Sequence, residues 1–249
     1  HDLGTCCLVQ IASRFICQQH GRADHGGAGL TNEHERIWRS VAADFPAMTS
    51  EFVISHGMCL PMLDEFGTDD QKRRFMPDSI AGRTMWCQMF SEPGAGSDVA
   101  SLQTKAEVDG DEWIVNGQKV WTTLAHRSQY GLLVARNDPD QVKHAGLSMF
   151  IVEMQAPGVE TRPIHQINGE SHFNEVFFTD VRVPHSNLLG AVGDGWRVAT
   201  TTLNNERSGL GNTASKGGGR LDIPDQTLEV VIAVILRAKD VETPEREQL

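Results

Sequence analysis

Apolar residues recur at helical spacing through the first third of the chain. One helix face is formed by Leu8, Ile11, Ala12, Phe15 and Ile16. Asn32 can cap a second helix, in which apolar residues lie four apart at Ile37, Val41 and Phe45. A further helical run covers residues 52–66 and ends at Gly67. The pattern predicts a helical region up to about residue 84.

A capping signal follows directly after Gly67. Thr68 and Gln71 stand three residues apart, which is the spacing of a capping box at a helix start. Pro77 comes a few residues later, and a proline inside a helix removes a backbone hydrogen bond. We therefore expect a short helix that ends before Pro77.

The pattern changes near Thr84, where short β-type runs begin and continue to about Gly190. Four turn signals separate these runs: Asp109-Gly110, Asn116-Gly117, Asn137-Asp138-Pro139 and Pro157-Gly158. Many short strands with regular turn signals are typical of a sandwich or barrel. The sequence predicts a β-domain here.

Helical spacing returns after the Gly-Asp-Gly segment at residues 193–195, and predicts a helix over 196–207. Three consecutive glycines within 212–220 indicate a flexible linker. The predicted architecture is α+β and multidomain. It has an N-terminal helical domain (1–84), a central β-barrel or sandwich domain (85–192), and the start of a C-terminal helical domain with an atypical tail (193–249).

Composition excludes several partners. The 249 residues carry a formal net charge of -11 without a basic stripe, so we expect no nucleic-acid partner. The five cysteines form an odd set without Cys-x-x-Cys spacing, which favours a reducing compartment over a disulfide framework or a zinc site. No signal-peptide pattern or membrane-length apolar run is present, so we expect a cytoplasmic protein without a membrane span.

The segment Ser-Glu-Pro-Gly-Ala-Gly-Ser-Asp at residues 91–98 is the first candidate for chemistry. It is not a dinucleotide fingerprint, because Val99 replaces the third glycine and a helix is not predicted next. Gly94 and Gly96 would let the backbone approach a ligand closely, while Ser91 and Ser97 supply hydroxyl groups. A phosphorylated or heteroaromatic cofactor suits this loop. The alternative is a plain turn between strands.

Two further motifs follow the loop: Asn-Gly-Gln-Lys-Val-Trp-Thr-Thr at 116–123 and Phe-Asn-Glu-Val-Phe-Phe-Thr-Asp-Val-Arg-Val-Pro at 173–184. In this order and spacing, the three motifs closely resemble the acyl-CoA dehydrogenase family. The resemblance extends over residues 26–211. It implies a helical domain followed by a β-barrel, with FAD as cofactor. It also implies α,β-dehydrogenation of an acyl-CoA thioester, in which a carboxylate removes the α-proton and hydride passes to flavin N5.

The resemblance also implies the residues of the cofactor site. Ser91 would bond the flavin ring, Trp121 would pack against it, and Thr123 would place its hydroxyl near N5. The full cofactor set is Gln88, Phe90, Ser91, Gly96, Ser97, Trp121, Thr122 and Thr123. Ser97 also matches an acyl-CoA contact. Taken without the motifs, Trp121 would instead be a core aromatic in a strand.

The base implied by the resemblance lies on the helix that follows the β-domain. Glu206 matches the carboxylate that some members place there, and Asn204 and Arg207 match acyl-CoA contacts. The alternative for Glu206 and Arg207 is a solvated charged pair on a helix surface.

Only residues 212–249 follow the part of the chain that resembles the family, and they do not match the family's long C-terminal helical bundle. Three interpretations therefore remain open: an acyl-CoA dehydrogenase, a non-catalytic or incomplete subunit of a heteromeric one, or a related flavin oxidase or monooxygenase. The first implies an electron-transfer flavoprotein as acceptor. The resemblance further implies a homo- or hetero-oligomer, either a dimer or a tetramer.

Overall fold

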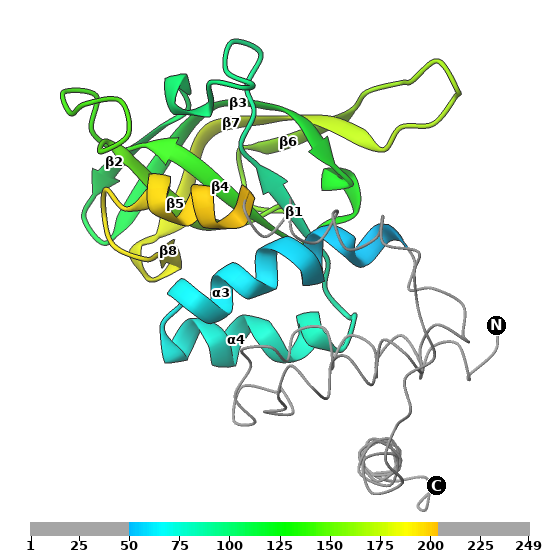
Figure 1. Cartoon of the computed structure of the whole chain (residues 1–249), viewed down its shortest axis with the longest axis horizontal. Helices are drawn as coiled ribbons and strands as arrows, with labels where there is room; N and C mark the ends of the chain where they lie inside the picture. The colour runs from blue at the N-terminus through cyan, green and yellow to red at the C-terminus, as the bar shows by residue number, and fades with distance from the viewer. Residues whose placement is uncertain (1–49, 204–249) are drawn as a thin grey trace, which may run out of the picture.

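The computed structural model describes residues 50–203 of the chain. Its first part is helical, as predicted, and consists of four short segments that follow one another (Figure 1). They are the 3-10 helix η3 (Ser50–Phe52), the π-helix η4 (Ser55–Cys59), α3 (Leu60–Phe66) and α4 (Asp69–Ile80). The helices predicted around residues 8–16 and 32–45 lie outside the described residues.

The capping box at the start of α4 is confirmed. The Gln71 amide donates to Thr68 Oγ1 at 3.2 Å, and the Thr68 amide donates to Gln71 Oε1 at 3.0 Å. The expectation that Pro77 follows the helix is wrong, because α4 continues through Pro77 to Ile80. Burial of Met76 and Ile80 on the side of α4 that faces the sheet favours the continued turn despite the hydrogen bond that proline cannot donate.

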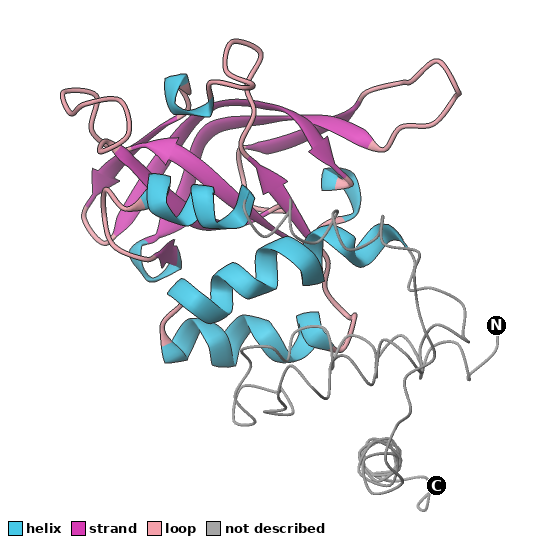
Figure 2. Cartoon of the chain, in the orientation of Figure 1, coloured by secondary structure: helices cyan, strands magenta, loops and turns pink. Residues whose placement is uncertain are grey.

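The second part of the described chain is a single eight-stranded sheet, as the β-type runs predicted. Figure 2 shows it as a curved layer of strands lying over the helices. The strands pair in the order β6-β7-β3-β2-β4-β5-β8, and β1 pairs with β4 in parallel. Their bounds are β1 (Trp86–Met89), β2 (Lys105–Asp109), β3 (Glu112–Thr123), β4 (Tyr130–Arg136), β5 (Leu147–Glu153), β6 (Val159–Pro163), β7 (Phe173–Pro184) and β8 (Leu188–Leu189).

Three of the four predicted turns connect strands. Gly110 and Gly158 adopt positive φ in turns that follow β2 and β5, and residues 137–139 lie between β4 and β5. The turn predicted at Asn116-Gly117 is wrong, because both residues lie inside β3. Gly117 instead adopts φ 151° at a β-bulge against β7, where a side chain would collide with Thr104.

The core has two layers, one on each side of the central strands. Leu132 of β4 and Ile151 of β5 pack with the helices and β1, whereas the neighbouring Leu133 and Phe150 pack inside the curve of the sheet. Strands buried on both faces carry continuous apolar sequence, which explains the apolar runs of β4 and β5. This arrangement fixes β1, and the loop that follows it, between the helices and the sheet.

The helix predicted after the β-domain is present over residues 195–203, and the rest of its predicted length lies outside the described residues. Val198 and Ala199 pack it onto the core layer shared with α3 and α4. The exact domain boundaries stay a prediction. Within residues 50–203, no helix has both the length and the apolar character that crossing a bilayer requires.

Candidate functional site

The three sequence motifs meet at the C-terminal end of β3. The Val120 amide of the second motif donates to the Ser91 carbonyl of the first at 2.9 Å. The Asn174 side chain of the third motif donates to the Thr122 carbonyl, also at 2.9 Å. Segments up to 83 residues apart in the sequence, 91 and 174, are therefore both hydrogen-bonded to the end of β3.

A second β-bulge aims Trp121 out of the sheet. Lys119 pairs with Val176 and Thr122 pairs with Asn174, so β3 carries one more residue than β7 between these pairs. Trp121 has φ 61°, and the residue is 60% exposed. Bulges re-aim side chains, and a non-glycine residue at positive φ is a strained conformation often found at functional sites. The alternative of a core aromatic is therefore wrong for Trp121.

Aromatic and polar side chains lie around the exposed indole. Phe173, which pairs with Thr123 across the sheet, makes an edge contact with Trp121 at a centroid distance of 6.1 Å. Thr123 is half-buried, while Thr122 points into the protein. The Thr122 hydroxyl is buried and has no hydrogen-bond partner among the described residues. The outer face at this end of β3 thus combines an exposed aromatic surface with a hydroxyl group.

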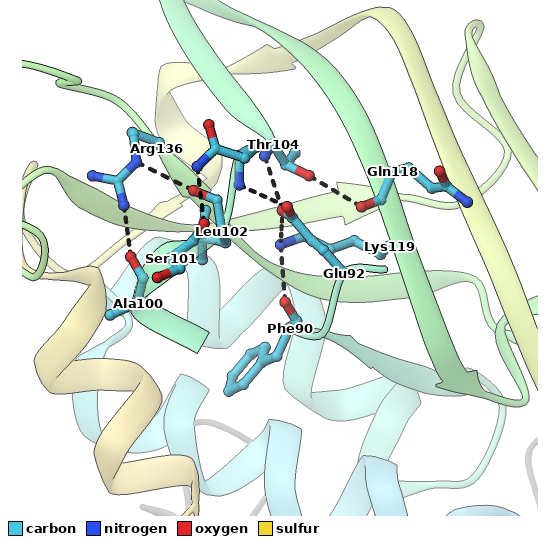
Figure 3. A network of polar contacts seen from close by, with 10 residues as sticks. Phe90, Glu92, Ala100, Ser101, Leu102, Thr104, Gln118, Lys119 and Arg136 are labelled. Carbon is cyan, nitrogen blue, oxygen red and sulfur yellow. Dashed lines mark hydrogen bonds and ion pairs between the residues drawn. The ribbon is translucent and has the colours of Figure 1, made fainter. Parts of the chain in front are cut away.

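Lys119 and Glu92 form an ion pair beneath the loop (Figure 3). Lys119 Nζ donates to Glu92 Oε1 at 2.9 Å and to the Phe90 carbonyl at 3.0 Å. Lys119 is fully buried and Glu92 is buried as well. Glu92 also accepts the backbone amides of Gln103 at 2.6 Å and Thr104 at 2.9 Å. Every charged atom of the pair therefore has a partner.

The ionisation of both groups is shaped by burial. Burial lowers the pKa of Lys119 to about 8, with the Glu92 carboxylate offsetting part of this change. Burial alone would raise the pKa of Glu92, but the Lys119 ammonium and the donated hydrogen bonds outweigh it and lower this pKa. At neutral pH we expect both groups to be charged.

The tip of the loop is open to solvent, although its base is buried. Glu92 and Ala95 exchange backbone hydrogen bonds of 2.9 and 3.1 Å, which close a tight turn around Gly94. This part of the alternative, a turn between strands, is present. Beyond it Gly96 and Ser97 are exposed, and a side chain at Gly94 or Gly96 would meet no described atom within 4 Å. A ligand can reach the backbone of this tip closely.

Predicted site residues are distributed between the surface and the interior. Gln88 and Ser91 are half-buried and Phe90 is buried. The structure brings Ser91, Trp121, Thr122 and Thr123 to the same end of β3, and their roles toward a cofactor stay predictions. The candidate base Glu206 and the candidate substrate residues Asn204 and Arg207 lie outside the described residues.

Sequence reasoning missed Glu92 and Lys119. A signal for Lys119 was present, because it stands in the same phase of the strand alternation as Trp113 and Val115, whose side chains are buried. Glu92 lies within the first motif, where attention to glycines and hydroxyl groups passed over its carboxylate. A buried lysine in a strand requires an anion nearby, and that requirement could have linked the two motifs.

Comparison with known proteins points to one family. Two family models match the chain: "Acyl-CoA dehydrogenase, N-terminal domain" over residues 17–83 and "Acyl-CoA dehydrogenase, middle domain" over residues 87–181. Acyl-CoA dehydrogenase IpdE1 of Mycobacterium tuberculosis is 48% identical over 186 residues, which are 74% of this chain and 48% of the relative. Acyl-CoA dehydrogenase FadE34 of the same organism is 50% identical over 209 residues, which are 84% of this chain and 29% of the relative.

Solved structures show the same fold. The structure named Tcur3481-Tcur3483 steroid ACAD has a TM-score of 0.68 and 30% sequence identity, covering 95% of this chain and 60% of that one. The chain spans about half or less of the curated relatives described above. The two family models, which together cover most of residues 17–181, are matched in the order found here, helices before sheet. The chain therefore belongs to the acyl-CoA dehydrogenase family, whose members depend on FAD.

Proposed function

We propose that this chain contributes the flavin side of the active site in an FAD-dependent acyl-CoA dehydrogenase. The observation that carries the proposal is the convergence of three distant motifs on the end of β3, where a strained bulge exposes Trp121. A buried charged network fixes this end of the strand. Such an arrangement is costly for a plain strand end and useful for a binding site.

The residues present fit a flavin. An exposed indole beside a half-buried threonine offers an aromatic surface and a hydroxyl group to a heteroaromatic ring. The open tip around Gly94 and Gly96 offers backbone without side chains in the way. In this proposal Ser91 and Thr123 hold the ring system, Trp121 packs against it, and the glycines admit the rest of the cofactor.

The chemistry to be explained is removal of two hydrogens from adjacent carbons of an acyl thioester. When bound, FAD supplies the hydride acceptor for the β-hydrogen. The α-proton is weakly acidic, so a base and hydrogen bonds to the thioester carbonyl are needed in a site closed to water. We assign the base to Glu206 and the acyl-CoA contacts to Ser97, Asn204 and Arg207, following the resemblance stated above.

A heteromeric assembly is a second candidate, favoured by the similar solved structures. The ChsE4-ChsE5 complex from Mycobacterium tuberculosis has a TM-score of 0.66 and 29% identity, covering 96% of this chain and 65% of that one. Its name joins two different proteins, ChsE4 and ChsE5, and the steroid ACAD likewise joins Tcur3481 and Tcur3483. This chain would then supply its β3 site to a partner that completes the acyl pocket. A bulky acyl group, such as one carried on a steroid, is the substrate class this favours.

Two further assignments complete the proposal. We assign electron transfer from the reduced cofactor to an electron-transfer flavoprotein, as expected for a dehydrogenase rather than an oxidase. For location we propose the cytoplasm, in keeping with the free thiols of Cys59 and Cys87.

The deciding experiment is an anaerobic absorbance titration of the FAD-loaded protein with a panel of acyl-CoAs, including a steroid acyl-CoA. We expect the flavin band near the visible maximum to bleach with a good substrate and to stay bleached until an acceptor is added. Glu206→Gln should keep flavin binding and lose bleaching by at least a hundredfold in rate, the order expected for removal of a general base. Undiminished bleaching in this variant would remove Glu206 from the role.

Admitting air to the bleached protein separates the reaction classes. Slow reoxidation supports a dehydrogenase, whereas rapid reoxidation with release of hydrogen peroxide supports an oxidase. Bleaching that requires a copurified second chain supports the heteromeric candidate. Failure to retain FAD with or without that second chain would contradict the proposal.

A further inference from the structure

A buried ion pair connects both ends of the loop that precedes β2 to the centre of the sheet. Lys119 of β3 donates to Phe90 and Glu92 at the start of the loop, at 3.0 and 2.9 Å. Glu92 in turn accepts the amides of Gln103 and Thr104 at the end of the loop, at 2.6 and 2.9 Å. Two side chains therefore hold the loop closed at its base, as Figure 3 shows.

Arg136 supports the same end of the loop from β4. Its guanidinium donates to the carbonyls of Ala100 and Leu102 at 2.7 and 3.2 Å, and its amide donates to the Thr104 carbonyl at 2.7 Å. The exposed tip at 93–98 stands between these fixed ends. Rigidity at the base is therefore built by side chains from two strands, β3 and β4, on either side of β2.

Stability alone does not account for a pair buried this deeply. Removing two charges from water is expensive, and well-packed apolar residues of similar size often serve a core equally well or better. A charged pair adds geometric specificity, because all of its hydrogen bonds are satisfied in one arrangement of the loop only. That arrangement fixes the position of the loop relative to β3.

We infer that Glu92 and Lys119 are positioning residues of the flavin site, which hold Ser91 and the loop tip in register with Trp121 and Thr123. This inference rests on the proposed function. Lys119 lies two residues before Trp121 and is the last residue paired with β7 before the bulge that exposes the indole. The pair thus fixes both walls of the candidate site at once, so that binding FAD does not require ordering of a glycine-rich loop.

The experiment compares the purified wild-type protein with Glu92→Gln, with the double variant Glu92→Gln/Lys119→Met, and with Arg182→Gln as a matched control. Arg182 bridges Asp109 and Glu112 on the surface near the opposite end of β3. Three quantities are measured after removal of FAD: the Kd for added FAD, amide hydrogen exchange across 91–104, and the thermal unfolding midpoint. The double variant has no unpaired buried charge, so it separates positioning from folding.

We expect the double variant to unfold near the wild-type midpoint, yet to bind FAD at least tenfold more weakly and to exchange faster at 93–98. Glu92→Gln should show the same two defects with a lower midpoint, and Arg182→Gln should match the wild type in all three. A purely structural role would lower the midpoint of Glu92→Gln and leave Kd and loop exchange of the double variant unchanged. That result would overturn the inference.

The wild-type titration separates this inference from the function on which it rests. If the wild-type protein does not bind FAD with or without a copurified second chain, the proposed function fails and the inference fails with it. If the wild-type protein binds FAD and the double variant binds it equally well, only the inference fails. Should Glu92→Gln fold too poorly to titrate, the double variant decides, because both of its substituted side chains are neutral.

Discussion

The two ends of β3 place the same kinds of side chain on opposite sides of the sheet. At the first end Trp113 is buried, 2% exposed, and the charged Glu112 meets Arg182 at the surface. At the second end the tryptophan is outside, with Trp121 60% exposed, and the charge is inside, on Lys119. Folding favours the burial of aromatic side chains and the exposure of charged ones. The reversal at the second end indicates that another requirement determines its side chains.

That requirement also appears in the backbone. Both halves of β3 meet a bulge against β7. At the first bulge the extra residue lies on β7 and β3 places Gly117 at φ 151°, whereas at the second the extra residue lies on β3 and Trp121 adopts φ 61°. Glycine tolerates such conformations and tryptophan does not. A strand therefore follows local rules where it only carries the fold and departs from them where the motifs converge. The predictions below test this contrast, beginning with the largest expected effect.

The two tryptophans should separate stability from binding. Trp113→Ala removes a ring that packs edge-on against Phe150 and donates to His185, so we expect it to lower the free energy of unfolding by about 3–5 kcal/mol. Trp121→Ala removes an exposed ring and should change stability by less than about 0.5 kcal/mol while weakening FAD binding roughly tenfold. Urea denaturation without FAD and FAD titration measure the two quantities.

The buried Glu92–Lys119 pair should contribute more to the free energy of unfolding than the exposed ion pairs of Arg182. Lys119→Met leaves the Glu92 carboxylate buried without its cation and should cost about 3 kcal/mol. This is the lower end of the range, because Glu92 keeps two amide donors and can take up a proton. Arg182→Met removes two exposed ion pairs and should cost less than about 1 kcal/mol. Equal losses in urea denaturation would contradict the contrast.

The sequence predicted the regular parts of this fold because their rules are local. Helical spacing before residue 84 and β-type runs after it gave the correct order of elements, and Thr68 with Gln71 gave the start of α4. The errors arose where packing overrides local preference. Pro77 was expected to end a helix that packing of Ile80 carries further. Asn116-Gly117 has turn composition but lies inside a long strand, opposite a bulge of β7.

The candidate site was predictable only in part, for a related reason. The three motifs could be named from the sequence, but their meeting depends on the pairing of β3 with β7 and on the loop after β1. The Glu92–Lys119 pair joins positions 27 residues apart, and no periodicity links them. Glycine inside a strand often marks a bulge, but this bulge holds Val120 and Trp121 and no glycine. The outward turn of Trp121 could therefore not be read from strand alternation.

Gly117 in β3 and Gly96 at the loop tip should separate stability from FAD binding in the same way, with smaller effects. Gly117→Ala would place a methyl group 2.5 Å from Thr104 Oγ1 at a φ that L-residues rarely adopt, so we expect a loss of about 1–3 kcal/mol. Gly96→Ala meets open space and should leave stability unchanged or raise it by about 0.4–1 kcal/mol. If FAD lies against this backbone, Gly96→Ala weakens FAD binding nonetheless. Thermal unfolding without FAD, followed by FAD titration, separates the two effects.

The smallest expected effect on FAD binding comes from pH and concerns Lys119. Burial lowers the pKa of Lys119 in the folded chain to about 8, whereas an ordinary lysine in the unfolded chain has a pKa of roughly 10.4. Between about pH 8 and roughly pH 10.4, the unfolded chain therefore keeps a proton on this lysine that the folded chain has lost. This term therefore makes the folded state more stable as pH rises through that window, since the cost of the buried charge is relieved. Below pH 8 the cost is present in full.

FAD binding should respond in the opposite direction. A neutral Lys119 donates weaker hydrogen bonds to Phe90 and Glu92 than an ammonium does, so the base of the loop loosens. We expect Kd for FAD to rise roughly threefold, about 0.6 kcal/mol, between pH 7 and 9. Lys119→Met should abolish this rise, whereas Arg182→Met should retain it. A rise of equal size in Lys119→Met would assign the titration to another group and leave Lys119 without a pH-dependent role at this end of β3.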